Sequence, residues 1–408
     1  MIYNKALVNL YTQEKLNDAL IYFYSLWKKR YLRTVENVPI KMEYLFYALD
    51  QPTTNNAVTV SEAMGYAMVI FPLMSRFDAE AKDTFTNIYN YIKNYPSVFN
   101  KNLMAWQQIK TADGKIVNAE KQTDSATDGD MDISYGLLLA QKLWGAIDKI
   151  NYRQEAINRI NALMDSCVDK TDYTLTLGDW VQGIPSTTFK GVTRSSDFML
   201  HHLIEFSKVN TQNADRWKRV IGRIVSIIDD QMTRESKNTG LMPDFFIKSD
   251  GIFIAPKTKI LESPHDGDYF TNSCRTPWRY SMPILFNNSQ VTNQISTLNK
   301  WIRQTTAQNP KNIKSGYYIA NGTPGASFGE TNNLAFIAPF LVSSLTQEGN
   351  DKWTLDIWNT LMEKPIEKCT FYENTLKLMA MIIATGNWFT PSSTDNLLKR
   401  QCQYRIYV

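Results

Sequence analysis

The feature that most constrains this chain is a helical repeat of apolar residues. In twelve stretches of 13 to 22 residues, apolar side chains recur at intervals of three and four, which is the period of one face of an α-helix. The stretches are residues 13–30, 59–75, 79–95, 129–148, 152–168, 195–208, 213–234, 276–288, 290–308, 330–345, 350–362 and 371–386. The pattern predicts an all-α protein with twelve main helices.

The connections between these stretches are unequal in length. Some have only a few residues, whereas five are long: 31–58, 96–128, 169–194, 235–275 and 309–329. The strand-like runs 172–177 and 252–255 lie inside long connections. Alternating short and long connections are typical of a toroid of helical hairpins in which one rim carries the functional loops. Since no Pro-, Gly- or Ser-rich linker divides the chain, we predict one domain over residues 1–408.

Charge and composition exclude several functions. The 408 residues include 44 Lys and Arg and 40 Asp and Glu, a net charge of +4 without a run of five like charges, so nucleic-acid binding is not expected. Three histidines, and four cysteines without a C-x-x-C pair, predict free thiols and no metal or other cofactor. No window of about 18 apolar residues predicts a membrane span. The first residues do not resemble a secretory signal.

Glu62 lies at the start of a strongly apolar predicted helix, in the sequence Thr59-Val60-Ser61-Glu62-Ala63-Met64-Gly65-Tyr66. One interpretation is a capping box, because a Thr followed three residues later by a Glu satisfies two N–H groups of the helix. The other is a carboxylic acid held among apolar neighbours, which raise its pKa and keep it protonated as a general acid. Alone, the pattern favours the capping box.

Three acids open the next predicted helix, in Ser125-Ala126-Thr127-Asp128-Gly129-Asp130-Met131-Asp132. Asp128 can be its N-cap, and Asp130 and Asp132 can complement the positive end of the helix dipole. Three acids in five residues exceed what one cap needs. A carboxylate fixed there could equally bind a ligand hydroxyl, and both interpretations stay open.

The segment Asn272–Arg279 places an amide, two guanidinium groups and an indole at the start of another helix, with Pro277 in its first turn. Arg275 and Arg279 lie one turn apart and could pair with surface acids. In carbohydrate sites, an indole stacks on the face of a sugar while neighbouring Arg and acidic side chains hydrogen-bond its edges. The segment is therefore a candidate carbohydrate site.

At these three segments the chain resembles glycoside hydrolase family 8. Ala126–Asp130 matches the family signature Ala-Ser/Thr-Asp-Ala/Gly-Asp, Ser61–Met68 matches the Ser-Glu-x-x-Gly-Tyr-x-Met pattern of the general acid, and Cys274–Arg279 matches Cys/Ala-Arg-x-Pro-Trp-Arg. Further similar segments are Arg194–Met199, Leu103–Trp106 and Gly386–Trp388. The resemblance implies an (α/α)6 barrel of twelve helices and inverting hydrolysis of a β-linked polysaccharide.

One departure from the family pattern concerns the general base. Many members have an Asp three residues before the first Arg of the Arg-x-Pro-Trp-Arg motif, here Arg275, and this chain has Asn272 there, whose amide cannot accept a proton. A subgroup that includes chitosanases and lichenases is similar in this respect and takes its base from a Glu in the preceding loop, at the place of Glu262. We therefore predict Glu262 as the base. The alternatives are Asp266, Asp268 and Asp244.

The resemblance implies that Glu62 protonates the glycosidic oxygen while Glu262 deprotonates a water on the opposite face of the sugar, with the two carboxyl groups about 6.5–9.5 Å apart. Asp128 is the third predicted catalytic residue and would bind hydroxyls of the distorted sugar. The predicted substrate-binding residues are Tyr66, Trp106, Asp130, Asp197, Asn272, Arg275 and Trp278, with Trp180 and Phe246 as further stacking candidates.

The predicted activity is endo-cleavage of β-1,4 linkages in a neutral β-glucan, either cellulose-like or mixed-linked. Chitosan or a bacterial exopolysaccharide is the second substrate hypothesis, since a net charge of +4 does not favour a polycation. The rival classes are a non-catalytic glycan-binding protein, suggested by Asn272, and a polysaccharide lyase. We expect a monomer that binds poly- or oligosaccharides. Its substrate class predicts secretion or a cell-surface location, although no signal peptide is visible.

Overall fold

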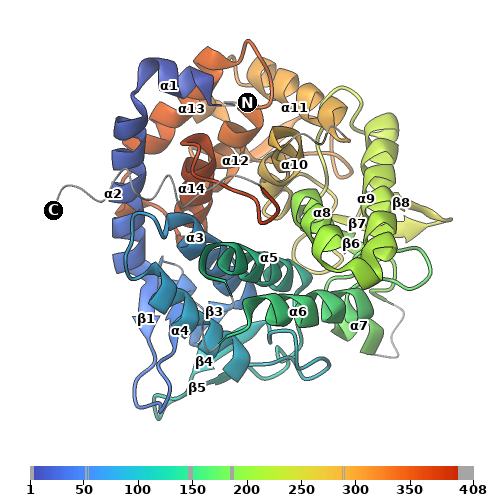
Figure 1. Ribbon diagram of the computed structural model, residues 1–408. Helices are drawn as coiled ribbons and strands as arrows, with labels where there is room; N and C mark the ends of the chain where they lie inside the picture. Colours follow the sequence, from blue (N-terminus) through green and yellow to red (C-terminus); the bar gives the residue numbers. More distant parts are fainter. Residues whose placement is uncertain are drawn as a thin grey trace.

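The computed structural model describes residues 4–50, 53, 55–145, 150–183, 188–286, 288 and 290–393 (Figure 1). Within them, twelve helices have ten or more residues. These are α2 (Gln13–Tyr31), α3 (Ser61–Met74), α4 (Ala81–Asn94), α5 (Thr127–Trp144), α6 (Tyr152–Ser166), α8 (Leu200–Val209), α9 (Ala214–Arg234), α10 (Thr276–Leu285), α11 (Thr292–Thr305), α12 (Leu334–Ser344), α13 (Asp351–Glu363) and α14 (Phe371–Ala384). Each overlaps one of the twelve predicted stretches, which confirms the helix-rich prediction.

Two shorter helices, α1 (Lys5–Leu10) and α7 (Trp180–Gly183), were not predicted. Both are too short to display a helical repeat of apolar residues. The ends of two predicted stretches, residues 146–148 and 287, lie outside the described residues.

Six of the longer helices contact one another in a closed cycle. α3 packs against α5, α5 against α8, α8 against α10, α10 against α12, α12 against α14, and α14 again against α3. Each of the other six packs mainly against one member of this cycle: α4 on α3, α6 on α5, α9 on α8, α11 on α10, α13 on α12 and α2 on α14. These six lie at the periphery in Figure 1. The chain therefore alternates between inner and outer helices.

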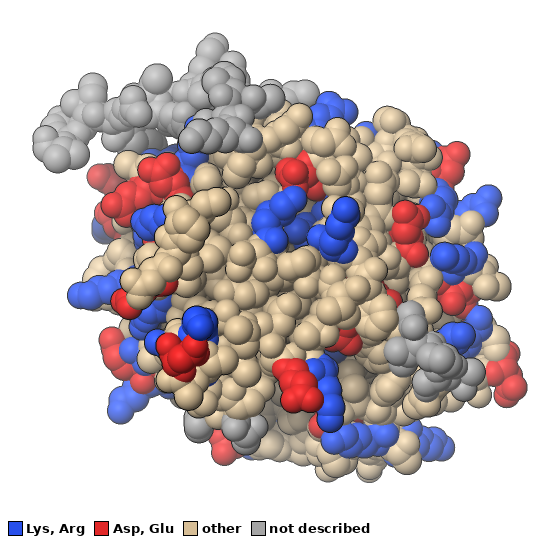
Figure 2. Space-filling view, turned by 90° about the horizontal axis from the view of Figure 1, so that it is seen from below, with Lys and Arg blue, Asp and Glu red and all other residues tan. Residues whose placement is uncertain are grey.

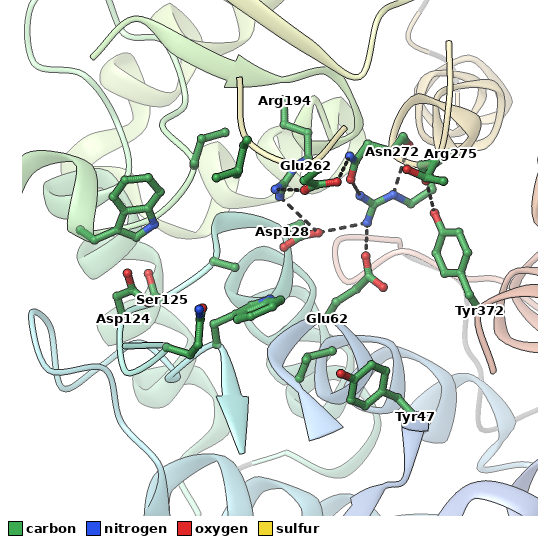
Figure 3. Close-up of a pocket in the computed structure, with 18 of the residues that line it drawn as sticks. Tyr47, Glu62, Asp124, Ser125, Asp128, Arg194, Glu262, Asn272, Arg275 and Tyr372 are labelled. Carbon is green, nitrogen blue, oxygen red and sulfur yellow. Dashed lines mark hydrogen bonds and ion pairs between the residues drawn. The ribbon is translucent and has the colours of Figure 1, made fainter. Parts of the chain in front are cut away.

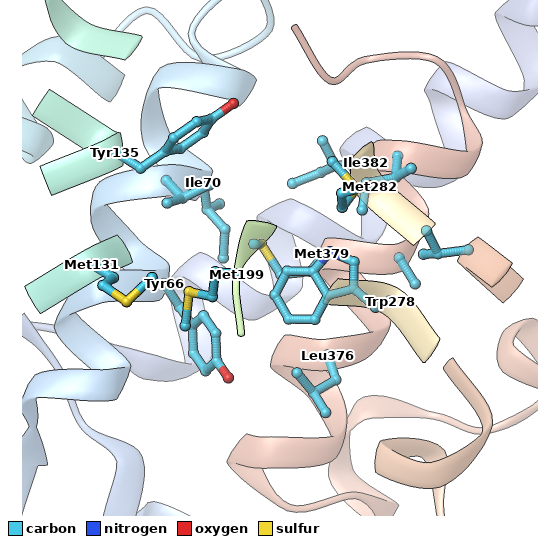
Figure 4. Packing of buried hydrophobic residues seen from close by; sticks show 14 of the residues in the cluster. Tyr66, Ile70, Met131, Tyr135, Met199, Trp278, Met282, Leu376, Met379 and Ile382 are labelled. Carbon is cyan, nitrogen blue, oxygen red and sulfur yellow. The ribbon is translucent and has the colours of Figure 1, made fainter. Parts of the chain in front are cut away.

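Burial distinguishes the inner helices from the outer ones. Every residue of α3 except Glu62 is buried, and every residue of α14 except Tyr372. An outer helix such as α9 buries one stripe, which includes Trp217, Ile224 and Ile228. Side chains of the inner helices meet at the centre of the core (Figure 4), as the labelled residues of α3, α5, α10 and α14 illustrate. The apolar residues that repeat along the helices thus belong to one shared core.

In the described parts of the connections there are ten strands of three to five residues. They are β1 (Leu32–Thr34), β2 (Glu43–Leu45), β3 (Ala57–Val60), β4 (Gln107–Lys110), β5 (Ile116–Asn118), β6 (Val192–Arg194), β7 (Phe245–Ser249), β8 (Ile252–Ile254), β9 (Lys314–Tyr317) and β10 (Ser327–Thr331). All pairs are antiparallel, in sheets ordered β1-β2, β3-β4-β5, β6-β7-β8 and β10-β9. These sheets shape the connections that carry the site.

The predicted run 252–255 is strand β8, but the prediction of a strand at 172–177 is wrong. Leu175 makes only an isolated bridge to Val168. The carboxylates of Asp169 and Asp172 accept hydrogen bonds from nearby backbone N–H groups, and Tyr173 has a φ of 62°. Such side-chain turns compete with an extended backbone, because they offer its N–H groups another acceptor.

Two buried ion pairs involve acids that follow Asp128. Asp130 on α5 pairs with Arg159 on α6. Asp132 accepts hydrogen bonds from both terminal nitrogens of Arg279 on α10 and lies 2.8 Å from Nε2 of His202 on α8. Burial alone would raise the pKa of Asp132, but Arg279 and His202 outweigh it and lower the pKa to about 2. Asp130 thus ties α5 to α6, and Asp132 ties α5 to α8 and α10.

Cys167, Cys274 and Cys369 are buried free thiols, as predicted, while Cys402 lies outside the described residues. Within the described part of the chain, no helix is both long enough and apolar enough to cross a membrane. No group of three or more His, Cys, Asp or Glu side chains there could hold a metal ion.

The close packing of α3 against α5 predicts that Gly136 cannot be enlarged. A Cβ placed on Gly136 would lie 2.4 Å from the carbonyl oxygen of Met68, a backbone atom inside a buried helix. We expect Gly136→Ala to lower the free energy of unfolding by about 1–3 kcal/mol, because the two helices must separate. Urea unfolding followed by circular dichroism measures this change.

The matched control is Gly222→Ala in α9, where an added Cβ would meet open space. This change should leave the free energy of unfolding unchanged or raise it by up to about 1 kcal/mol, because Ala favours a helix over Gly. Equal effects of the two substitutions would contradict the packing argument.

Candidate active site

A cleft with a volume of about 580 Å³ opens beside the N-terminal ends of several inner helices (Figure 3). Its walls combine acids, guanidinium groups and aromatic rings. The lining residues are Tyr47, Val60, Glu62, Trp106, Gln122, Asp124, Ser125, Ala126, Asp128, Leu177, Trp180, Arg194, Leu261, Glu262, Thr271, Asn272, Arg275, Phe371 and Tyr372.

Helix starts bring charged and polar groups to this cleft. Glu62 is the second residue of α3, and Asp128 is the second residue of α5. Arg275 ends the short 3-10 turn η4 (Ser273–Arg275), which leads into α10. Tyr372 is the second residue of α14. Because all four helices belong to the closed cycle, these residues meet although they are far apart in the sequence.

Glu62 is the accessible residue of α3, with 23% of its side chain exposed. Its Oε2 accepts a hydrogen bond from Nη1 of Arg275. Burial raises the pKa of Glu62 to about 7, which Arg275 opposes and Asp128 supports. A carboxyl group with such a pKa is largely protonated below neutral pH and can act as a general acid.

The capping-box interpretation of Glu62 is wrong. The N-cap residue of α3 is Val60, and no side chain caps the helix. Thr59 belongs to strand β3, where it pairs with Gln108 of β4. The strand runs directly into the helix, so Thr59 is not free to cap it.

Asp128 is buried beside Glu62 and is also not an N-cap, because that position is held by Ala126. Its Oδ2 accepts from Nη1 of Arg275 at 3.0 Å, and its Oδ1 accepts from the backbone N–H of Gly129 at 2.8 Å. Burial would raise the pKa of Asp128, but Arg275 and Arg194 hold it below its usual value. The cleft therefore holds an acid and a carboxylate side by side.

Asn272 connects Arg275 to Glu262. Nη2 of Arg275 donates to Oδ1 of Asn272 at 3.0 Å, and Nδ2 of Asn272 donates to Oε2 of Glu262 at 2.7 Å. The dashed contacts in Figure 3 follow this chain from Glu62 through Arg275 and Asn272 to Glu262. The two glutamates thus face one cleft, separated by two polar side chains.

Glu262 lies in the connection between β8 and η4, and 40% of its side chain is exposed. Its Oε1 accepts a hydrogen bond from Nη2 of Arg194 at 2.9 Å, at the end of strand β6. Both carboxylate oxygens are therefore oriented by donors, while the group stays accessible from the cleft. A carboxylate in this position can accept a proton from a bound water.

The three alternative bases do not line the cleft. Asp244 is 1% exposed, and Asp266 and Asp268 are fully buried. Each accepts several hydrogen bonds from backbone N–H groups: Asp244 from residues 270, 272 and 273, Asp266 from residues 260–263, and Asp268 from residues 319–321. Their carboxylates hold loops in place.

Five of the residues predicted to bind substrate are buried and do not line the cleft. Asp130 is fully buried in its pair with Arg159, and Asp197 is 1% exposed. The other three are aromatic residues buried in the core: Tyr66, Trp278 and Phe246. Each belongs to a segment next to the cleft, but its side chain points into the protein.

Two of the predicted stacking residues, Trp106 and Trp180, do line the cleft, as do Asn272 and Arg275. The structure adds residues that the sequence reasoning missed, among them Arg194, Asp124, Tyr47 and Tyr372. Arg194 and Tyr372 had a signal, because each adjoins the start of a predicted helix, as Glu62 and Asp128 do. Tyr47 and Asp124 lie in long connections and had no such signal.

A family profile and several known enzymes match this chain over most of its length. The sequence profile of the glycosyl hydrolases family 8 matches residues 10–386. A β-glucanase of Niallia circulans is 39% identical over 383 residues, which cover 94% of this chain and 88% of the relative. An endoglucanase of Bacillus sp. (strain KSM-330) is 31% identical over 388 residues, covering 94% and 79%.

A solved structure also matches nearly the whole chain. The apo structure of a β-1,3-1,4-glucanase from Paenibacillus sp. X4 has a TM-score of 0.83 and 39% identity, and the match covers 93% of this chain and 94% of that one. The match of the family profile extends over nearly the whole described chain and includes Glu62, Asp128 and Glu262. The chain therefore belongs to glycosyl hydrolase family 8.

Proposed function

We propose that this chain is an inverting, endo-acting hydrolase of β-glucans. The observation that carries the proposal is the pair of accessible glutamates, Glu62 and Glu262, which face one cleft and are linked through Arg275 and Asn272. The β-glucanase and endoglucanase relatives support a β-glucan as the substrate.

The scaffold that we propose is an (α/α)6 barrel over residues 1–408, forming one catalytic domain. The closed cycle of six helices, each covered by an outer helix, supports it, as does the TM-score of 0.83 to the β-1,3-1,4-glucanase structure. One large cluster of buried apolar residues runs from Leu7 to Trp388, which supports a single folding unit.

In the proposed reaction, Glu62 donates its proton to the glycosidic oxygen as the bond to the anomeric carbon breaks. Its raised pKa suits a proton donor near neutral pH. Asp128 binds hydroxyls of the distorted sugar, where such contacts strengthen in the transition state. Its low pKa keeps it an acceptor throughout.

Glu262 is the proposed general base and takes a proton from the water that attacks the opposite face of the sugar. An inverting pair leaves room for this water. Asn272 holds Glu262 by its amide, in line with the subgroup of the family in which an Asn replaces the usual Asp base. The accessible Glu262 also argues against a purely glycan-binding protein, whose cleft would need no such base.

For the substrate we propose a neutral β-1,4- or mixed-linked β-glucan. The indoles of Trp106 and Trp180 suit stacking on sugar faces. Chitosan is disfavoured, because the acids of the cleft stand beside Arg194 and Arg275. On the face drawn in Figure 2, both charge signs are interspersed.

A polymeric substrate is met outside the cell, so we further propose a secreted or cell-surface enzyme.

Hydrolysis of a glycan panel tests the activity. We expect reducing sugar from mixed-linked β-glucan and carboxymethyl cellulose, with a rapid fall in viscosity, because an endo-acting enzyme cuts within chains. Chitosan should be hydrolysed more slowly. The first product should be the α-anomer, which proton NMR detects. No release from any β-glycan would exclude a hydrolase, and an initial β-anomer would exclude inversion.

Substitution of the two glutamates tests their roles. Glu62→Gln and Glu262→Gln should each lower kcat on β-glucan by about 10²–10⁴-fold or more, because each removes a proton-transfer group. Oligosaccharide binding and melting temperature should remain close to those of the wild type. The control is Glu80→Gln, because the side chain of Glu80 is 80% exposed and lies outside the cleft. Near-full activity of Glu262→Gln would show that another group is the base.

The pH profile tests the acid. Since Glu62 acts in its protonated form and its pKa is raised to about 7, kcat/KM on β-glucan should fall as the pH rises through about 7. A β-cellobiosyl fluoride needs less protonation of its leaving group and should show a much weaker alkaline fall. A β-glucan profile that stays flat to pH 9 would contradict this assignment.

A further inference from the structure

We propose that Asp266 is the positioning residue of the general base. Its carboxylate fixes the backbone turn that carries Glu262, and it does so without reaching the cleft. The inference rests on the proposed role of Glu262 as the base. Asp266, which the sequence offered as an alternative base, would instead position Glu262.

The carboxylate of Asp266 is fully buried and accepts four backbone N–H groups in a row. Oδ2 accepts from Ile260 at 2.7 Å, Leu261 at 2.7 Å and Glu262 at 3.1 Å, and Oδ1 accepts from Ser263 at 2.8 Å. The N–H of Glu262 itself is among the donors. The backbone of the base is therefore bound directly to Asp266.

The turn itself belongs to no helix or strand. Residues 255–272 connect β8 to η4, and neither a helix nor a strand is assigned to them. Partly buried N–H groups that lose their acceptor are costly, so a turn of this kind keeps its shape only while the acceptor is in place. A charged acceptor makes these hydrogen bonds about twice as strong as a neutral one.

The strands β6 and β7 anchor Asp266 in turn. The N–H of Phe245 in β7 donates to the backbone oxygen of Asp266 at 2.8 Å, and Phe245 pairs with Arg194 of β6. Arg194 donates to the carboxylate of Glu262 at 2.9 Å. The same two strands thus fix Glu262 at both ends, the backbone through Asp266 and the carboxylate through Arg194.

The consequence concerns the rate of the chemical step. A general base has to lie within hydrogen-bond reach of the water that it deprotonates. A misplacement of about 1 Å can cost about 10²-fold in rate. An amide at position 266 would keep one acceptor oxygen and turn its NH2 group toward N–H donors, so the turn would lose its shape.

The first test compares Asp266→Asn with Asp268→Asn. Asp268 is equally buried and accepts three backbone N–H groups, from residues 319–321, but it does not hold Glu262. We expect Asp266→Asn to lower kcat on β-glucan about 10²-fold with KM within about threefold of the wild type. Asp268→Asn should lower the melting temperature to a similar extent while kcat stays within about threefold.

Azide provides a readout that a loss of stability would not change. It can attack the anomeric carbon without a base, while the bond to the glycosidic oxygen breaks and that oxygen takes the proton of Glu62; the product is an α-glycosyl azide. Azide should therefore accelerate Asp266→Asn and Glu262→Gln, but neither the wild type nor Asp268→Asn. If Asp266→Asn is poorly folded, Asp266→Glu, which keeps the charge, should show partial activity and the same azide response.

The outcomes separate the inference from the proposed function. If Glu262→Gln is inactive while Asp266→Asn keeps kcat within threefold, the positioning role is wrong and the base assignment stands. Equal losses of kcat in Asp266→Asn and Asp268→Asn, without azide rescue, would also overturn it. If Glu262→Gln keeps its activity, the base assignment fails, and the inference fails with it.

Discussion

The buried guanidinium of Arg275 is the interaction on which the site depends. Only 1% of Arg275 is exposed, and it donates to groups on four segments of the chain. Its acceptors are Glu62 of α3, Asp128 of α5, Ser196 before α8 and Asn272 before α10. A buried cation is very costly without such acceptors. The geometry of the cleft is therefore coupled to the closure of the helix cycle that brings these segments together.

Two neighbouring carboxyl groups contact this cation but differ in protonation state. Glu62 and Asp128 both contact Nη1 of Arg275, yet the pKa of Glu62 is raised and that of Asp128 is lowered. Asp128 also lies 4.0 Å from Arg194 and accepts the N–H of Gly129, whereas Glu62 has fewer charged donors to offset its burial. Two acids of similar chemistry thus receive different roles from their surroundings.

The sequence predicts the longer helices well, because every one of them buries apolar side chains in a common core and these side chains repeat with the helical period. Residue roles within one helix are harder to predict. Asp128, Asp130 and Asp132 resemble one another in the sequence, but successive residues turn by about 100° around a helix. Asp128 therefore meets the cleft, Asp130 points to Arg159 on α6, and Asp132 lies a turn deeper, against Arg279. The motif locates the site but does not separate these three acids.

The long connection 235–275 shows why an acid in a loop is so easily mistaken for a catalytic one. Its backbone makes few ladder hydrogen bonds, so its N–H groups need other acceptors. Asp244 and Asp266 supply them, Asp268 does the same for residues 319–321 of another connection, and all three acids are buried. Which N–H groups need an acceptor depends on tertiary contacts, which a sequence pattern does not contain. Glu262 differs because its carboxylate accepts from side chains, those of Arg194 and Asn272, among the residues that the structure describes. Its carboxylate therefore stays accessible and can take up a proton, while Asp266 holds its backbone.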